Sequence, residues 1–428
     1  MESRRLAREL KKHEVPTVTW VTKKWPVFWR RAKGVHVWDV DGNRFLDLTS
    51  AFGVASLGHS HPKVTAAIRK QSRDLCHAMG DVHPAEAKAR LCARLSEVTF
   101  ERWTGGRGEG QAILCNAGFE AVEAALKTAK LFTRKRGVIA FEGAYHGLGY
   151  GALEATWRTD FRQPFLDQLG HFVEFVPYPR EGAGEEALAA VEKRIRELAG
   201  NREIGAILVE PFQGRGGEVI PPAGFLPMLR RLCDRGRMLL IADEIYTGFW
   251  RTGKWFGVEH TKVVPDVVCL GKALSGTLPI SACVGKSEVM GAWPESAGES
   301  LHTSTFLGNP LACAAALASL DVFESEAAGW NVMQKGGVLL DELRRRLGAH
   351  PAVKDIRGIG LMAGIEFVAG AKRMPSVLCE RLLARGILAL PSGSRGEVLG
   401  IMPPLVMNGE TLQWAAGEIA DFGFRISE

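Results

Sequence analysis

Short apolar runs alternate with helical patterns through the middle of the chain. The runs predict seven β-strands, and the segments between them, such as 187–193 and 226–232, have the apolar spacing of amphipathic helices. The predicted strands cover residues 111–115, 137–141, 171–176, 205–209, 237–242, 266–270 and 281–284. Such alternation predicts an α/β fold with a mainly parallel seven-stranded sheet, covered by helices on both faces, whose ligands bind at the strand ends.

The pattern changes after Pro310, where a long alanine-rich helix leads into two short strands around a glycine turn, at 353–358 and 361–366. These elements predict a second, smaller α+β domain. We expect the large domain to span residues 66–315 and the smaller domain to contain residues 316–428.

The composition excludes several classes of protein. Of the 428 residues, 46% are hydrophobic and 24% are charged, as in an ordinary globular protein. The net charge of +6 is spread through mixed sequences, so we predict no nucleic-acid partner. Apolar stretches are too short to span a membrane, and the charged N-terminus lacks the apolar core of a secretion signal. We therefore expect no membrane association and a cytoplasmic location.

Cysteine and histidine give no sign of a metal site. The eight cysteines form no Cys-x-x-Cys pair, and several lie in apolar runs, which indicates buried free thiols in a reducing compartment. His59 and His61 lie in a loop flanked by glycine and proline, without a nearby acid cluster. We interpret them as polar contacts of the loop and predict no metal.

Two of the predicted strands end in residues that carry chemistry. The run 238–242 ends in Asp243, and the run 267–270 is followed by Gly271 and Lys272. A lysine in an apolar pocket has a lowered pKa and can form an imine with an aldehyde, while a buried aspartate can keep a pyridine nitrogen protonated. The pair suits a pyridoxal phosphate site. A helix-capping acid beside a solvated lysine is an equally good interpretation of this pair alone.

Further residues strengthen the cofactor hypothesis. Asn116 follows a predicted strand and precedes an alanine-rich helix, which predicts that Asn116 is the N-cap. The backbone amides of Gly118 and Phe119, at the start of that helix, could bind a phosphate. Tyr145, in a loop after another apolar run, could stack on a planar ring. Each of these features also occurs in turns and loops that bind nothing.

Together these residues resemble the class III, or omega, aminotransferases of pyridoxal-phosphate fold type I. The resemblance covers nearly the whole chain and is most specific around Asp243 and Lys272. The matching stretches are 37–47, 57–62, 242–254, 265–266, 271–274 and 403–405.

The resemblance implies a role for each residue near the cofactor. Lys272 resembles the Schiff-base lysine and Asp243 the partner of the pyridine nitrogen. Tyr145 and Ile245 resemble the two faces of a sandwich around the ring. The family also builds its small domain jointly from the C-terminal part and an N-terminal segment, which here corresponds to residues 1–65.

The phosphate site of the family is matched with one departure. Gly118 and Phe119 align with the phosphate-binding turn, but the family usually has serine or alanine where this chain has Phe119. Thr305 matches a threonine that reaches the phosphate of the neighbouring subunit's cofactor. The resemblance therefore implies a homodimer with shared active sites.

Other positions resemble the substrate pocket of the family. Phe52 and Trp29 lie where the family places pocket walls, although single aromatics near a glycine often only fill a core. Glu210 matches a glutamate near the substrate, and a strand-end carboxylate in a hydrogen-bond network is an equally good interpretation. Aromatic walls would suit an apolar or extended amine.

Departures from the family pattern bear on the keto acid. Members that use 2-oxoglutarate commonly carry one arginine after the Tyr-His-Gly motif and another before the C-terminal proline-rich segment, and here those positions hold Leu148 and Gly400. The amine:pyruvate branch instead uses an arginine on a mobile loop, for which Arg395 is the candidate; an ordinary solvated loop arginine is the alternative. Dicarboxylate substrates are therefore disfavoured, because a buried carboxylate needs a partner.

The resemblance thus predicts a transaminase that works in two half-reactions. An amine donor gives up its amino group, with Lys272 moving the proton, and a keto acid, expected to be pyruvate, takes the group up. A pyridoxal-phosphate epimerase or aminomutase, or a transaminase that uses 2-oxoglutarate, would employ the same residues. A nicotinamide dehydrogenase would need a glycine fingerprint that the chain lacks, and a binding protein without catalysis is the last alternative.

Overall fold

The seven predicted strands form one sheet in the computed structural model, which describes residues 1–19, 25–201, 203–371 and 373–423. Their spatial order is β4-β10-β9-β8-β7-β5-β6. β10 is antiparallel to both of its neighbours, and the other pairs are parallel. The mainly parallel seven-stranded sheet is therefore confirmed. The strands are β4 Gly110–Cys115, β5 Gly137–Phe141, β6 Val173–Val176, β7 Ile204–Val209, β8 Leu239–Asp243, β9 Val267–Leu270 and β10 Ser281–Lys286.

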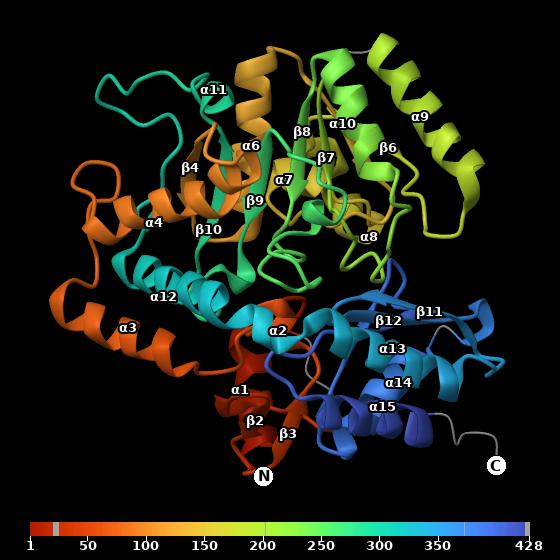
Figure 1. Ribbon diagram of the computed structural model, residues 1–428. Coiled ribbons are helices and arrows are strands. Elements are labelled where there is room, and N and C mark those ends of the chain that lie inside the picture. Colours follow the sequence, from red (N-terminus) through yellow and green to blue (C-terminus); the bar gives the residue numbers. More distant parts are fainter. Residues whose placement is uncertain (20–24, 202, 372, 424–428) are drawn as a thin grey trace.

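Helices surround this sheet and extend into the lower half of the molecule (Figure 1). Among the described residues the helices are α1 Glu2–His13, α2 Ser50–Gly53, α3 Pro62–Asp74, α4 Glu86–Ser96, α5 Arg102–Thr104, α6 Gly118–Thr133, α7 Tyr150–Glu154, α8 Thr159–Arg162, α9 Gly184–Asn201, α10 Phe225–Gly236, α11 Ser287–Met290, α12 Pro310–Glu326, α13 Val332–Leu347, α14 Met374–Ala384 and α15 Gly409–Gly423.

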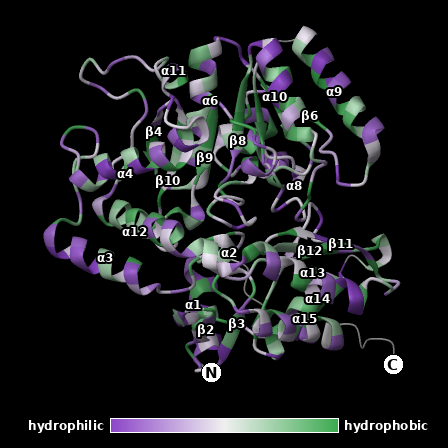
Figure 2. Ribbon diagram, in the orientation of Figure 1, coloured by the Kyte–Doolittle hydropathy of each residue, from purple (hydrophilic) through white to green (hydrophobic). Residues whose placement is uncertain are grey.

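Both faces of the sheet are buried, which explains why its strands are continuous apolar runs. Along β8, Leu239 and Ile241 join a cluster with the apolar face of α6, whereas Leu240 and Ala242 join the main core on the other face. The strands accordingly appear as uninterrupted hydrophobic arrows between helices that are polar on their outer sides (Figure 2). Side chains that alternate between two apolar layers leave the strand ends as the place for polar chemistry.

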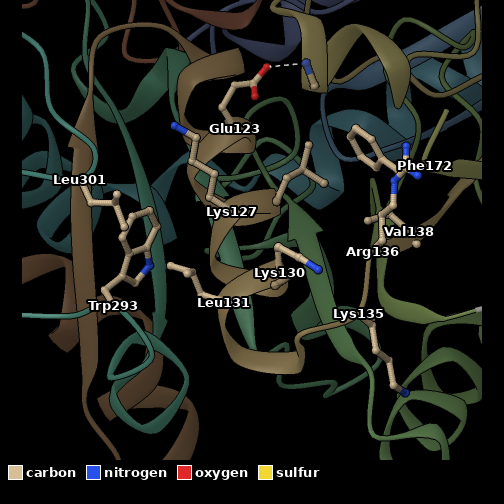
Figure 3. Close-up of a pocket in the computed structure, with 15 residues that line it drawn as sticks. Glu123, Lys127, Lys130, Leu131, Lys135, Arg136, Val138, Phe172, Trp293 and Leu301 are labelled. Atoms are coloured by element: carbon tan, nitrogen blue, oxygen red, sulfur yellow. Dashed lines mark hydrogen bonds between the residues drawn. The ribbon is translucent and has the colours of Figure 1, made fainter. Parts of the chain in front are cut away.

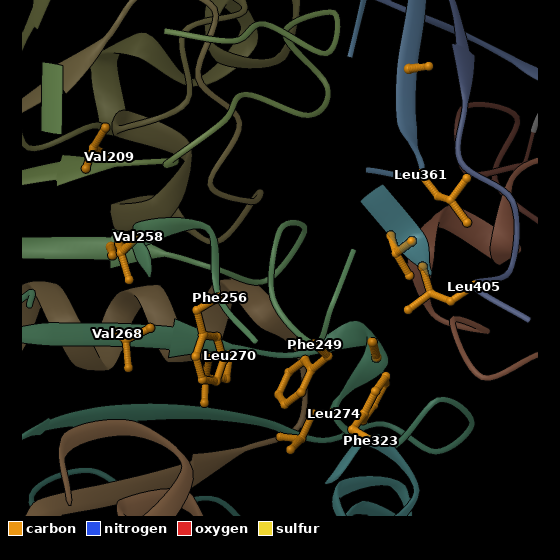
Figure 4. Close-up of a cluster of buried hydrophobic side chains, with 14 of the residues drawn as sticks. Val209, Phe249, Phe256, Val258, Val268, Leu270, Leu274, Phe323, Leu361 and Leu405 are labelled. Carbon is orange, nitrogen blue, oxygen red and sulfur yellow. The ribbon is translucent and has the colours of Figure 1, made fainter. Parts of the chain in front are cut away.

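The main core continues from the sheet into the lower half of the molecule. Figure 4 shows Val268 and Leu270 of β9 beside Phe256, followed by Phe249 and Phe323 and then by Leu361 and Leu405. Phe249 and Phe256 lie with ring centroids 5.5 Å apart, and Phe249 and Phe323 with centroids 5.6 Å apart. This aromatic packing joins the large sheet to the C-terminal part of the chain.

The two ends of the chain build one structure below the large sheet. The N-terminal strands β1 Trp29–Lys33, β2 His36–Asp39 and β3 Arg44–Asp47 form a sheet that is completed by β13 Ile387–Leu388. β13 is parallel to β3, with Ile387 opposite Leu46. The N-terminal segment thus shares a sheet with the C-terminal part.

A second small sheet contains the predicted hairpin of the C-terminal part. Its strands are β11 Val353–Ile359, β12 Met362–Phe367, β15 Val398–Ile401 and β14 Leu390–Ser392, in that spatial order. β11 and β12 pair antiparallel around Gly360, whose φ of 57° is readily adopted only by glycine. The two strands and their glycine turn are confirmed.

The predicted start of α6 is wrong in one detail. The N-cap is Ala117, and its side chain makes no capping hydrogen bond. The amide of Asn116 instead donates to Glu120 Oε2 at 2.8 Å, and the Asn116 side chain donates to Ser304 Oγ at 3.1 Å. The carboxylate of Glu120 binds the amide of the residue before the cap, one position earlier than the glutamate of a capping box does, so the asparagine side chain is not needed there.

The cysteines are free thiols, and most of them are buried, as predicted. Among the described residues, no helix combines the length and the apolar character that crossing a bilayer requires.

Candidate active site

The carboxyl ends of four neighbouring strands border one cavity of about 370 Å³. β7 and β8 lead into it directly, β9 leads into it through a single glycine, and β5 leads into it through the short loop 142–144. The lining residues are Gly118, Phe119, Tyr145, His146, Gly147, Leu148, Glu210, Arg215, Asp243, Ile245, Tyr246 and Lys272. The structure therefore brings together seven of the residues that the sequence singled out for cofactor or substrate contact.

Lys272 begins a short 3₁₀ turn directly after Gly271 and lies in the left-handed region, with φ of 44°. A side chain in that region costs about 1–3 kcal/mol and persists only where the surroundings enforce it. The Lys272 Nζ lies 4.8 Å from the centre of the Tyr246 ring. Burial lowers the pKa of Lys272, although the carboxylates of Asp243 and Glu210 oppose this shift. The amine is thus shifted towards its neutral, nucleophilic form.

Asp243 is held by a histidine that the sequence analysis did not select. His146 Nδ1 lies 2.8 Å from Asp243 Oδ2, and the amide of Ile245 donates to Asp243 Oδ1 at 3.1 Å. Both side chains are buried, with Asp243 at 4% and His146 at 3% exposure. His146 Nε2 has no partner among the described residues. The arrangement orients a carboxylate at the bottom of the cavity.

Glu210 connects two segments of the cavity wall. Its Oε1 accepts a hydrogen bond from the amide of Tyr145, and its Oε2 accepts one from the amide of Gly214, both at 3.0 Å. Burial raises the pKa of Glu210, against the opposing effect of His146 and the two amides. Both oxygens of this carboxylate are therefore occupied by backbone groups, which is the network role that the sequence left open.

The start of α6 offers donors for an anion. The amides of Gly118 and Phe119 have no hydrogen-bond acceptor among the described residues, as expected for a first helical turn. A Cβ added at Gly118 would approach Ile245 Cδ1 to 3.0 Å, so glycine keeps this approach open. Free amides at the positive end of a helix dipole are suited to a phosphate.

Taken together, the lining fits pyridoxal phosphate. An amine and an oriented carboxylate lie on neighbouring strands, the amides of α6 face the same space, and Tyr145 and Ile245 supply an aromatic and an aliphatic wall. The cavity has room for a ring with a phosphate, and its polar groups are those that an aldehyde, a pyridine nitrogen and a phosphate require.

Four of the expected residues lie away from this cavity, namely Thr305, Phe52, Trp29 and Arg395. Thr305 is exposed and does not line it. Phe52 and Trp29 line a second, largely apolar cavity of about 530 Å³, together with Trp25 and Phe28. Phe52 precedes Gly53, where an added Cβ would lie 3.6 Å from the Lys272 side chain. The residue that follows Phe52 therefore approaches the lysine side chain.

The turn that carries Phe52 has an unusual backbone. Ser50, Ala51 and Phe52 have φ values of 46°, 49° and 62°, and Gly53 continues the left-handed run at 82°. Ser50 Oγ donates to the Met402 carbonyl at 2.7 Å, which ties the turn to the C-terminal part. The strained turn leaves Phe52 61% exposed, next to the glycine that approaches Lys272.

Arg395 also lies outside the cavity lining, and Arg215 lies within it. Arg395 is exposed, and its amide donates to Glu397 Oε2 at 2.7 Å. Arg215 follows Glu210 in a glycine-rich turn, and its guanidinium carbon lies 4.7 Å from the centre of the Tyr145 ring. The sequence signal was available, because Arg215 is flanked by glycines directly after a predicted strand, but nothing in the sequence placed it beside Tyr145.

A larger cavity of about 580 Å³ lies along α6 and beside the start of β5 (Figure 3). Its walls include Leu131, Val138 and Phe172, and Lys127 and Lys130 project from α6 beside it. It shares no residue with the lining of the Lys272 cavity. Size alone therefore does not identify the candidate site.

Near the site, Glu218 fills a slot between two glycines that face each other across β12 and β15, Gly364 and Gly400. Its carboxyl is buried and accepts a hydrogen bond from Ser392 Oγ at 3.1 Å, while Oε2 has no partner among the described residues. Burial raises the pKa of Glu218 to about 8. This carboxyl is therefore protonated at neutral pH.

Glu218 should make the stability of the protein depend on pH. Because its folded-state pKa exceeds the unfolded value, its stabilising effect is complete below the unfolded pKa and is lost as the pH rises through about 8. The Glu218→Gln variant keeps the size and shape of the side chain but has no carboxyl group that can ionise. Between about pH 5 and about pH 9 the wild type should therefore lose roughly 2–4 °C more in melting temperature than this variant. Melting curves across pH measure this, with the exposed Glu181→Gln as control, and equal slopes for wild type and Glu218→Gln would contradict it.

A family model and two known proteins that resemble this chain are all described as aminotransferases. A family model described as Aminotransferase class-III matches residues 19–422. The acetylornithine aminotransferase of Methanopyrus kandleri is 39% identical over 398 residues, which are 93% of this chain and 94% of that protein. The 4-aminobutyrate aminotransferase of Mycobacterium leprae is 35% identical over 409 residues, covering 90% of this chain and 88% of that protein.

A solved structure shares the fold over nearly the whole chain. The amine transaminase from an uncultivated Pseudomonas species, in its PLP-bound form, superposes with a TM-score of 0.86 and is 28% identical. The match covers 96% of this chain and 98% of that structure.

Proposed function

The chain belongs to the class-III aminotransferases, which use pyridoxal phosphate to move an amino group from an amine to a keto acid, and from this premise we propose that its acceptor is pyruvate and its donor a non-dicarboxylate amine. One observation carries the proposal. Gly400, where 2-oxoglutarate users are expected to have arginine, packs against the buried carboxyl of Glu218; an added Cβ would lie 3.0 Å from its Oε1. Leu148, the other such position, is an apolar residue of the lining.

The residues of this chain have separate tasks in the proposed mechanism. The bound cofactor supplies an aldehyde that condenses with amines and a protonated ring that withdraws electrons from the reacting carbon. Lys272 would hold the cofactor through Nζ, and, once displaced by a substrate amine, would carry the proton between the two reacting carbons. Asp243, oriented by His146 at 2.8 Å, would keep the proton on the ring nitrogen.

The remaining lining residues would position the cofactor. The free amides of Gly118 and Phe119 would bind its phosphate, and Tyr145 and Ile245 would lie against the two faces of its ring. Glu210 would act through the backbone of Tyr145, which it holds at 3.0 Å. The apolar cavity around Phe52 and Trp29 would receive the side chain of the amine donor.

The acceptor is tested by a panel of keto acids with one fixed amine. We expect kcat/KM for pyruvate to exceed that for 2-oxoglutarate by about 10–100-fold, because the second carboxylate would lose a charge-assisted hydrogen bond of roughly 1.5–3 kcal/mol. Product masses measure the transfer. Equal efficiency with both acids would overturn the proposal, and product formed from the amine without any keto acid would instead indicate an aminomutase or epimerase.

We also propose a homodimer with shared active sites. Thr305 lies on an exposed segment beside Leu301 and Phe306, which are 63% and 58% exposed, and none of the three lines the cavity of its own chain. A second copy covering these apolar side chains would bring Thr305 to the phosphate at the neighbouring site. A monomer in sedimentation at micromolar concentration would overturn this.

A reducing compartment, such as the cytoplasm, is the proposed location. Its support is that all eight cysteines are free, including the exposed Cys76. Cell fractionation that finds the protein in an oxidising compartment would overturn it.

A further inference from the structure

We propose that Arg215 binds the carboxylate of the keto acid and of the amino acid formed from it, and so restricts these substrates to monocarboxylates. The inference rests on the proposed function, because it names the group that recognises the acceptor in the same site. It differs from the sequence-based expectation, in which Arg395 has this role.

Arg215 lines the cavity of Lys272 and presents its guanidinium to the aromatic wall. The guanidinium carbon lies 4.7 Å from the centre of the Tyr145 ring and 6.0 Å from the centre of the Phe161 ring. A planar guanidinium that rests on aromatic faces keeps its in-plane N–H groups free for other partners. The rings thus fix the orientation of the guanidinium and leave its donors available.

No carboxylate of the described residues is paired with Arg215. Asp160 is near enough to interact electrostatically, but Arg158 holds its two oxygens at 3.1 and 2.6 Å. Both oxygens of Glu210 are occupied by backbone amides. Arg215 is exposed, and among the described residues its side chain makes neither a hydrogen bond nor an ion pair. Its donors are therefore open to a carboxylate that enters the cavity, which they can bind with two parallel hydrogen bonds.

The backbone around Arg215 is held in place from several sides. Gly214 donates to Glu210 Oε2 at 3.0 Å, and the Arg215 carbonyl accepts from the amide of Gly393 at 3.1 Å. The carbonyl of Gly217 accepts two hydrogen bonds from Arg357, at 2.9 and 2.6 Å. Glu210 also accepts a hydrogen bond from the amide of Tyr145. One carboxylate therefore positions both the backbone next to Arg215 and the aromatic residue that its guanidinium contacts. A pre-positioned donor pair loses little entropy when it binds.

The charges of the lining indicate one carboxylate rather than two. Lys272 and Arg215 are the lysine and arginine residues of the lining, and Lys272 is committed to amine chemistry. Arginine matches a carboxylate with two parallel hydrogen bonds, which a single such residue can offer to a single carboxylate. The site therefore suits pyruvate-like keto acids and the corresponding amino acids, and also amines without a carboxylate.

Arg395 provides a matched control on the adjoining loop. Gly393 of that loop donates to the carbonyl of Arg215, and Arg395 is exposed like Arg215 but does not line the cavity. Arg395→Gln removes the same charge at a nearby position outside the proposed contact. Arg215→Lys keeps the charge and loses the planar pair of donors.

The experiment compares two amine donors that differ in a carboxylate, L-alanine and isopropylamine. In single-turnover reactions followed by the colour of the bound cofactor, Arg215→Gln should raise the apparent Kd for L-alanine by about 10–100-fold and leave that for isopropylamine within about twofold. Arg215→Lys should fall between wild type and Arg215→Gln, and Arg395→Gln should match wild type. Calorimetry with propionate, which cannot react, should show binding to wild type and at least a tenfold weaker Kd for Arg215→Gln.

The outcomes separate this inference from the proposed function. Equal losses for both amines in Arg215→Gln, or a selective loss in Arg395→Gln alone, would overturn the role of Arg215 while the transaminase reaction stands. A wild type that converts no amine would overturn the proposed function. In that case propionate binding that depends on Arg215 would still support the carboxylate site, and binding that does not depend on it would overturn it.

Discussion

Lys272→Ala should lower the transamination rate by at least about 10²–10⁴-fold, because the variant lacks the amine that we propose moves the proton. The amine is placed for this task. Lys272 lies two positions after the end of β9, and its backbone is held at φ of 44°. Asp243 lies on the neighbouring strand β8. Alanine would also remove the proposed covalent attachment of the cofactor. The rate is measured with saturating amine and keto acid.

The exposed Lys193→Ala of α9 serves as the control and should keep the wild-type rate. Added methylamine should restore part of the activity of Lys272→Ala, since a small free amine can carry the proton. Reduction of the wild type with borohydride should leave the cofactor on the peptide that contains Lys272. A cofactor label on another lysine, or normal turnover by Lys272→Ala, would contradict the role proposed for Lys272.

Arg251→Met should lower the free energy of unfolding by roughly 3–5 kcal/mol. Arg251 is buried, with 1% exposure, and joins three parts of the chain. Its Nη1 donates to the carbonyls of Leu361 and Pro403, at 2.9 and 2.6 Å, and its Nη2 donates to the hydroxyls of Ser50 and Ser56, at 3.3 and 2.9 Å. Methionine has a similar length but leaves these acceptors buried without a donor.

Denaturant unfolding measures this loss, and the exposed Arg231→Met of α10 is the control. Burial lowers the pKa of Arg251 only to about 10, so the guanidinium remains charged at neutral pH. A loss below about 1 kcal/mol would show that the carbonyls and hydroxyls find other partners. Because Ser50 belongs to the left-handed turn beside Lys272, the variant should also lose activity at temperatures where it is still folded.

The sequence predicted the large sheet well because the physics of its strands is local. The central strands β5, β7, β8, β9 and β10 are buried on both faces, so each appears as a continuous apolar run whatever its neighbours are. The same local signal placed Asp243 and Lys272 at strand ends. The order β4-β10-β9-β8-β7-β5-β6 then brought those ends to one edge. The resemblance to a family supplied what periodicity did not, including the shared use of both chain ends.

Contacts between distant segments were not predictable in this way. His146 meets Asp243, and Arg215 meets Tyr145, only because loops after different strands converge on the same cavity. The left-handed run at Ser50 to Gly53 has only its last residue as a sequence signal, and the hydrogen bond from Ser50 to Met402 supports it from the other end of the chain. The sequence predicts Asn116 as the helix cap, because the hydrogen bond between its amide and the carboxylate of Glu120 is visible only in three dimensions.

The pairing of β3 with β13 has a consequence for biosynthesis. Leu46 leaves the ribosome about 340 residues before its partner Ile387, which is a delay of roughly 20–70 s at ordinary translation speeds. During that time the edge of β3 and the apolar side chains of Phe45 and Leu48, which are buried in the finished protein, have no permanent cover. The nascent N-terminal segment is therefore a predicted binding site for chaperones until the last strands emerge.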